Sequence, residues 1–269
     1  MFGLSKGLWM LVIPKFILGV IAVVLFCTST IPLYYLVITL IMWSLISGLG
    51  IAVGYHRVFS HKTHLLPRWK ENIILFFATF AAQGSPLFWI AVHRGYHHPH
   101  ADTLRDIHSP VAYSKFHAFI GWLNINSEKD NVINIKYAID LLRKPNFVWF
   151  HKHYYKIVWW VPTIVAIVNW KLAFAAFFLP TAIGLLQDNL VNVFGHTKAY
   201  IGYRNFDTSD HSQNNFLLGY LGWGQGWHNN HHAKPAEYDF GKKCSGKWWE
   251  FDPSVIFLPF LGKPSRVKR

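Results

Sequence analysis

The sequence predicts an all-α integral membrane protein, in which four transmembrane helices carry a cytosolic helical cap with a polyhistidine site for two metal ions. Three observations lead to this fold class: an apolar composition, long stretches without charge, and clustered histidines outside those stretches. Hydrophobic residues make up 52% of the 269 residues and charged residues only 14%, whereas about a quarter of a soluble domain is charged. No linker rich in Gly, Ser or Pro divides the chain, so we treat residues 1–269 as a single domain.

The first two predicted transmembrane helices come from one uncharged stretch. No Asp, Glu, Lys or Arg occurs from Phe16 to Tyr55, and because one crossing takes about 20 residues, this stretch is long enough for two. We place the helices near residues 8–27 and 32–54. Between them, the sequence CTSTIP (Cys27–Pro32) supplies the Ser, Thr and Pro residues that favour a turn.

The other two predicted transmembrane helices lie on either side of Lys171, near residues 154–170 and 172–190. A further apolar stretch, Ile73–Val92, is interrupted by the sequence QGSP at Gln83–Pro86. Because Gly and Pro break regular structure, this stretch predicts a buried or half-inserted helix pair rather than a fifth crossing.

Four crossings leave about residues 56–153 and 191–269 as the cap, on the same side of the membrane as both termini. Nearly all Lys and Arg residues fall on that side, so the positive-inside rule predicts that the cap and both termini are cytoplasmic. The formal net charge is +13. Since no nucleic-acid motif accompanies this charge, we expect anionic lipid headgroups or a negatively charged substrate handle, and no nucleic acid.

The histidines are concentrated in the predicted cap. The chain has sixteen, and none lies in the four predicted transmembrane helices. Three groups and one pair stand out in the sequence: HRVFSH from His56, HRGYHH from His93, HNNHH from His228, and Asn192 with His196. Residues three or four apart on a helix share a face, and neutral imidazole is the commonest protein metal ligand.

Nine histidines in four places predict a site for one or two metal ions next to the bilayer. An all-nitrogen ligand set suits Zn, Cu, Fe or Ni, and the spacing alone leaves the choice of metal open. We expect the remaining seven histidines to be hydrogen-bonded structural residues; they are His64, His100, His108, His117, His151, His153 and His211.

The three histidine groups resemble the three histidine boxes of the integral-membrane fatty-acid desaturases, most closely the Δ9 acyl-CoA and acyl-lipid (stearoyl-CoA-like) branch. The sequence RDIHSP after the second box, GWHNNHHAKP at the third and KWWEFDP (Lys247–Pro253) behind it are also similar to that branch. The similarity extends over roughly residues 30–258. Two positions differ from the common family pattern: the second box has H-x3-HH spacing, and Gln225 stands where a Glu is frequent.

The resemblance implies a four-helix membrane stem, a cytosolic cap and a centre of two iron ions. By motif position, Asn192 would contact one iron through water, and Gln83 and Trp89 would lie at the bend of a tunnel for the acyl chain. The implied histidine ligands are His56, His61, His93, His97, His98, His196, His228, His231 and His232.

The implied activity is an O2-dependent desaturation that introduces a cis double bond, at Δ9, into a saturated acyl chain carried by CoA, a carrier protein or a glycerolipid. Two electrons would come from an external donor such as ferredoxin or cytochrome b5. A membrane diiron hydroxylase shares the boxes and is the alternative. A metal transporter is disfavoured because transporters place ionisable residues inside the membrane, whereas the predicted transmembrane helices contain no histidine.

Overall fold

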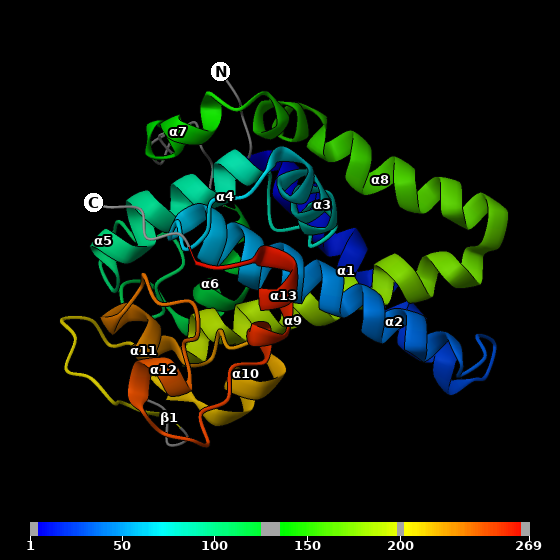
Figure 1. Cartoon of the computed structure of the whole chain (residues 1–269). Helices are drawn as coiled ribbons and strands as arrows, with labels where there is room; N and C mark the ends of the chain where they lie inside the picture. The colour runs from blue at the N-terminus through cyan, green and yellow to red at the C-terminus, as the bar shows by residue number, and fades with distance from the viewer. Residues whose placement is uncertain (1–4, 125–134, 198–201, 265–269) are drawn as a thin grey trace.

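The protein is mostly helical (Figure 1), and the computed structural model describes residues 5–124, 135–197 and 202–264. Within these residues, three helical stretches are long and apolar enough to cross a membrane: Met10–Cys27, Tyr35–Ser60 and Pro145–Phe194. Both chain termini, which the sequence predicts to be cytoplasmic, lie outside the described residues. The finding supports a membrane protein, as the composition predicted.

The first two apolar helices are separated at the predicted turn. Helix α1 (Ser5–Cys27) ends at the cysteine, and α2 (Tyr35–Trp43) continues directly into a π-helix, η1 (Ser44–Ser60). In the turn, Ser29 has a positive φ of 55°. Because η1 ends at Ser60, the second apolar helix (α2 with η1) extends six residues beyond the predicted end at residue 54. His56 therefore lies within the helix.

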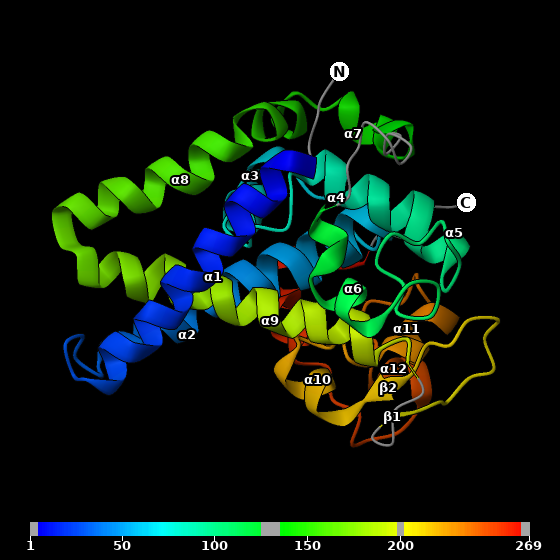
Figure 2. The same cartoon turned by 180° about the vertical axis from the view of Figure 1, so that it is seen from behind.

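The third apolar stretch is a bent helix. It consists of α8 (Pro145–Ala173), the π-helix η5 (Phe174–Phe178) and α9 (Leu179–Phe194). Inside α8, Asn169 leaves the helical conformation with φ −152° and ψ 96°, and Figures 1 and 2 show that the chain folds back there. The reversal is two residues before Lys171, and the first arm begins at Pro145 rather than at residue 154.

The residues predicted to form a helix pair do so. Helix α3 (Arg68–Thr79) and helix α4 (Pro86–Val92) are separated by a turn with positive φ at Ala82 (59°) and Gly84 (106°). Helix α3 packs closely along η1, because a side chain at Gly50 would come within 2.7 Å of the backbone of Ala78. Small residues permit such close contacts between helices.

The remaining elements are short and form the cap. In Figures 1 and 2, α5, α11 and α12 lie at one end of the molecule, and the turns of the apolar helices lie at the other. The two strands pair antiparallel, with Gly202 opposite Asn215. These elements are η2 (His93–His97), α5 (His98–His100), α6 (Lys115–Phe119), η3 (Gly121–Asn124), η4 (Ile135–Ala138), α7 (Ile139–Leu142), β1 (Gly202–Tyr203), β2 (Asn214–Asn215), α10 (Phe216–Leu221), α11 (His228–Ala233), α12 (Lys242–Ser245), η6 (Pro253–Phe257) and α13 (Leu258–Leu261).

A buried ion pair joins the second apolar helix to the C-terminal part of the cap. The Arg57 guanidinium donates to Asp252 Oδ2 at 2.8 Å and to the carbonyl oxygens of Tyr238, Ala52 and Trp223. Both charged side chains are fully buried. Because Arg57 follows His56 directly, this pair fixes the end of the helix that carries the first histidine box.

Candidate metal centre

The structure brings all nine histidines of the predicted ligand set together in two groups. Within each group, one ring nitrogen of every histidine lies within 4.8 Å of the corresponding atoms of the others. The first group is His56, His61, His93, His98 and His231, and the second group is His97, His196, His228 and His232.

Two π-helices set the positions of the first and second boxes. In η1 the amide of His61 donates to the carbonyl oxygen of His56 (3.1 Å), an i→i+5 bond that places these histidines on the same side of the chain. In η2, His93 faces the first group while His97 faces the second. The second box thus contributes to both groups, as does the third, from which only His231 belongs to the first group.

Inside each group, Nε2 atoms face one another. In the first group, His231 Nε2 lies 2.9 Å from His56 Nε2 and 2.8 Å from His98 Nε2, and His61 Nε2 lies 2.9 Å from His93 Nε2. A neutral imidazole has one donor and one acceptor nitrogen. Five converging Nε2 atoms cannot all satisfy one another, whereas a central cation would accept every lone pair.

In the second group, His228 Nε2 lies 2.8 Å from His196 Nε2. Three rings of this group also have a carboxylate at Nδ1. His97 Nδ1 lies 3.0 Å from Asp106 Oδ2, His196 Nδ1 lies 3.1 Å from Asp102 Oδ1, and His232 Nδ1 lies 2.6 Å from Asp210 Oδ2. An Nδ1–H that donates to a carboxylate leaves Nε2 with the lone pair that a metal needs.

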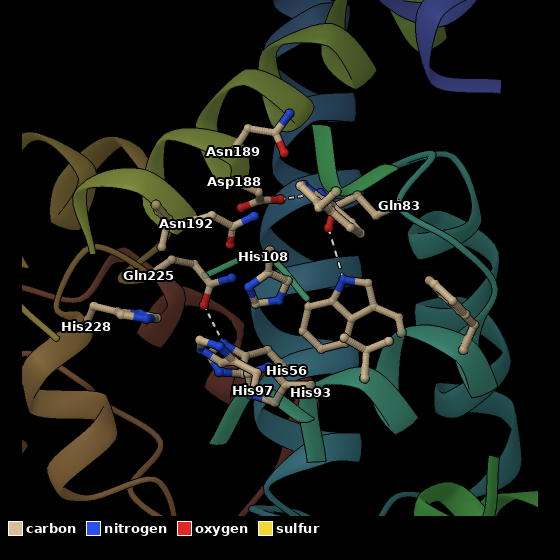
Figure 3. A pocket seen from close by; sticks show the side chains of 15 residues that line it. His56, Gln83, His93, His97, His108, Asp188, Asn189, Asn192, Gln225 and His228 are labelled. Atoms are coloured by element: carbon tan, nitrogen blue, oxygen red, sulfur yellow. Dashed lines mark hydrogen bonds between the residues drawn. The ribbon is translucent and has the colours of Figure 1, made fainter. Parts of the chain in front are cut away.

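The outer contact of His56 is of a different kind. Its Nδ1–H donates to the amide oxygen Oε1 of Gln225, the contact drawn in Figure 3. Among the described residues, His228 Nδ1, His231 Nδ1 and His232 Nε2 are buried without a hydrogen-bond partner. His196 Nδ1 and Asp102 Oδ1 also lack a hydrogen bond of good geometry, and their 3.1 Å contact is an ion-pair contact.

Burial keeps most of these rings neutral. Burial, with the neighbouring imidazoles His56, His61 and His98, lowers the pKa of His231 well below its usual value. For His196, burial lowers the pKa, but Asp102 together with the charges of Asp106 and Asp210 raises it, and the net pKa lies above the usual value. Neutral imidazole is the form that binds a metal.

The two asparagines of the HNNHH sequence anchor the helix α11. Asn229 Oδ1 accepts the backbone N–H groups of Asn205 and Phe206, both at 2.8 Å. Asn230 Nδ2 donates to Glu250 Oε2 (2.6 Å) and to the carbonyl oxygen of Phe240 (2.8 Å). The asparagines therefore face away from the histidines and fix the orientation of the third box.

A cavity of about 70 Å³ borders both histidine groups (Figure 3). The two predicted tunnel residues are in its wall: Trp89 Nε1 donates to Gln83 Oε1 (3.1 Å), and Gln83 Nε2 donates to Asp188 Oδ2. Asn192, predicted as a metal partner, lines the same cavity. The lining residues are His56, Gln83, Phe88, Trp89, Val92, His93, His97, His108, Trp122, Asp188, Asn189, Val191, Asn192, Gln225 and His228.

The acidic residues around the site, Asp102, Asp106 and Asp210, were not predicted from the sequence. Asp106 lies within the sequence RDIHSP, which carried the family resemblance, but nothing in its spacing indicated a role. His108, expected to be structural, lies in the cavity wall, and its Nδ1 is 3.2 Å from Asp106 Oδ1. With His97 and Asp106 it forms a third cluster whose ligand atoms lie close enough together to hold a metal ion. Asp102 and Asp210 belong to no recognisable sequence motif, because they reach His196 and His232 only through the fold of their loops.

Six histidines expected to be structural lie outside the metal-binding groups of the described residues. His64 Nδ1 contacts Thr63 Oγ1 (3.0 Å), His117 Nε2 contacts the carbonyl of Ile107 (2.9 Å), and His151 Nδ1 contacts Ser85 Oγ (2.6 Å). The other three are His100, His153 and His211.

Fold and site together define a helical membrane protein whose histidines form two adjoining groups able to hold metal ions. Residues 28–240 match the family model for fatty acid desaturases, and the chain belongs to the fatty acid desaturase family, which is a family of oxidoreductases.

Curated relatives agree with this membership. The chain is 32% identical over 233 residues to a probable chloroplastic lipid desaturase of Arabidopsis thaliana, covering 83% of this chain and 61% of the relative. It is 31% identical to an sn-2 palmitoyl-lipid 9-desaturase of Nostoc (83% of this chain, 78% of the relative). It is 29% identical to an sn-1 stearoyl-lipid 9-desaturase of Anabaena variabilis (86% of this chain, 83% of the relative).

Proposed function

We propose that the two histidine groups bind two iron ions, five imidazoles around one and four around the other, with Asn192 as a water-mediated partner of the second. The convergence of the nine rings in two groups is the observation that carries this proposal. At a metal–nitrogen distance of about 2.1 Å, opposite ligands lie about 4.2 Å apart, close to the 4.8 Å spread of each group. Imidazole nitrogen is a suitable ligand for iron.

The proposed reaction is the O2-dependent desaturation of a fatty acyl chain. An unactivated C–H bond offers no proton or leaving group to side-chain chemistry, and the bound irons would supply the oxidation that it requires. The chain's own residues hold the substrate: the cavity borders His56, His93, His97 and His228 and would position two neighbouring CH2 groups beside the metals. Misplacement by about 1 Å can lower a rate by about 10²-fold.

Gln83 and Trp89 would set the bend of the acyl tunnel. Their hydrogen bond, together with the contact of Gln83 with Asp188, fixes the indole in the cavity wall. The Trp89 ring also stacks on the ring of His93, with centroids 5.0 Å apart and planes at 18°. The position of a CH2 group along the tunnel would therefore be fixed relative to the first histidine group.

We assign the double bond to Δ9 in the cis form, because the Nostoc and Anabaena relatives are named 9-desaturases of lipid-linked acyl chains. The acyl carrier is CoA, a carrier protein or a glycerolipid. Two electrons would come from ferredoxin or cytochrome b5, acidic donors that suit the basic surface.

We further propose that residues 1–269 form one desaturase domain with four membrane crossings, the reversal at Asn169 dividing the 50-residue stretch Pro145–Phe194 into two. The metal centre and both termini would face the cytoplasm, in contact with membrane lipid, as the distribution of Lys and Arg indicates.

The test is expression in a host that lacks its own desaturase, followed by mass analysis of the fatty acids. We expect acyl chains that have lost two hydrogens, with the double bond at carbon 9. A gain of one oxygen would instead identify a hydroxylase. The variant His228→Ala is the matched control and should yield only saturated chains. If expression of the unmodified protein leaves the fatty-acid profile of the host unchanged, the proposal is contradicted.

A further inference from the structure

The acidic side chains around the two histidine groups are distributed unevenly. Asp102, Asp106 and Asp210 each lie within 3.1 Å of an Nδ1 atom of the second group. Over the described ranges of the chain, every ion pair between a histidine and a carboxylate involves one of these three aspartates. The first group has no such contact there, and the outer partner of His56 is the neutral amide of Gln225.

Charged residues beside the first group do not reverse this difference. Arg57 follows His56 and Arg94 follows His93 in the sequence. Each guanidinium is paired with a carboxylate, Arg57 with Asp252 at 2.8 Å and Arg94 with Asp140 at 2.7 Å. The surroundings of the first group therefore carry no net negative charge, whereas three carboxylates adjoin the second.

Burial strengthens the effect of those carboxylates. The side chains of Asp106, Asp102 and Asp210 are 0%, 6% and 12% exposed. Coulomb interactions between buried charges are screened less than those at a surface. Because the interaction energy grows with the charge of the ion, a trivalent ion gains more from these carboxylates than a divalent ion does.

We propose that Asp102, Asp106 and Asp210 make the two metal sites unequal, so that the second histidine group is the one that stabilises ferric iron. This inference rests on the proposed two-iron centre. With iron bound at both groups, removal of one electron per chain by an external oxidant would leave the ferric charge at the second group, beside the three carboxylates, and ferrous iron at the first. The aspartates contact the ligands and not the metal, and are therefore positioning residues that tune the site through its imidazoles.

The experiment uses the full chain in detergent, loaded with Fe(II) enriched in the Mössbauer-active isotope. One equivalent of ferricyanide removes one electron per chain and is reduced to ferrocyanide, and Mössbauer spectra then measure the ferric share of each site. Two variants assign the signals: Asp210→Asn removes a charge beside His232 while keeping a hydrogen-bond acceptor, and Gln225→Glu adds a charge beside His56. Asp207→Asn is the matched control, since that carboxylate is fully exposed in the same loop.

We expect the ferric signal of the unmodified protein to be the one that Asp210→Asn perturbs. Each variant should shift Fe(III) toward the first group, raising the ratio of ferric iron at the first group to ferric iron at the second by about tenfold, while Asp207→Asn leaves this ratio unchanged. If Asp210→Asn does not fold, Asp106→Asn provides the same comparison. An equal ferric share at both sites of the unmodified protein, or a ferric signal whose spectral parameters change in Gln225→Glu but not in Asp210→Asn, would overturn the inference alone. Binding of fewer than two irons would overturn the proposed function and this inference with it.

Discussion

At the scale of the residue, the central feature is that four of the nine imidazoles have a polar contact at Nδ1, the ring nitrogen away from the other histidines: His56 with Gln225, and His97, His196 and His232 with aspartates. The bond from His232 Nδ1 to Asp210 (2.6 Å) and that from His56 Nδ1 to Gln225 leave the Nε2 atoms turned inward. Fixing one nitrogen selects the tautomer and the ring orientation. The groups are thus arranged for metal binding by their surroundings.

His231 is the most informative single ligand. Its Nε2 contacts both His56 and His98, and the residue is fully buried. We expect His231→Ala to abolish desaturation and to lower the bound iron, because the first group loses its shared contact, while the protein stays in the membrane fraction. Elemental analysis of the purified variant, together with its fatty-acid products, checks this. Full activity with unchanged iron would show that His231 is not a ligand.

His117 provides the opposite expectation. It bonds the carbonyl of Ile107 at 2.9 Å and stacks on Tyr113, outside the histidine groups. We expect His117→Ala to keep its iron and more than half of its activity, since losing one such bond costs about 1 kcal/mol. The same assays apply, and loss of iron from this variant would mean that the ligand set is incomplete.

Spacing in the sequence was sufficient to select the nine histidines, because boxes of imidazoles are rare and local. It could not select the three aspartates or assign His108 to the cavity wall. Asp210 precedes the third box by eighteen residues and reaches His232 only through the fold of its loop. Such contacts depend on tertiary structure and leave no periodic signal.

At the scale of the element, the π-helices η1 and η2, which carry the first and second histidine boxes, were not predicted from the sequence. The spacing of His93 and His97 predicted one shared face of an α-helix, yet the two rings belong to different groups. A π-helix changes the direction of successive side chains, and such turns are frequent at functional sites. The helix pair around QGSP was predictable, because Gly and Pro mark the break locally.

The buried pair of Arg57 and Asp252 allows a prediction on stability. We expect Asp252→Ala to destabilise the protein by about 3–5 kcal/mol, because it leaves a buried guanidinium without its counter-ion. Thermal unfolding in detergent measures the change. The control is Asp140→Ala at the more exposed pair with Arg94, where Asp140 is 40% exposed and a smaller loss is expected. Equal losses in the two variants would contradict the assigned importance of the buried pair.

At the scale of the whole molecule, the turns of the apolar helices and the histidine-bearing elements lie at opposite ends (Figures 1 and 2). Composition and charge-free stretches predicted the long apolar helices, since both report directly on the membrane as a solvent. The ends of the helices were less predictable: α8 begins at Pro145, and the polar residue His151 lies inside this helix, buried and in contact with Ser85, so it does not mark a loop.

The two cysteines test the proposed orientation. Both are free; Cys27 is exposed at the turn after α1, and Cys244 is buried in the cap. With four crossings and a cytoplasmic cap, Cys27 faces the outside, so a membrane-impermeant maleimide should label intact cells at this residue. Cys27→Ser is the control and should remain unlabelled. Labelling that requires lysis of the cells would place the turn on the cytoplasmic side and reverse the orientation.

The most direct test of the two-metal centre is the metal content of active, purified protein, measured by elemental analysis against the protein concentration. The nine converging histidines predict two irons per chain, with zinc and copper well below one. Active protein that contains no iron, or only one iron per chain, would contradict the account.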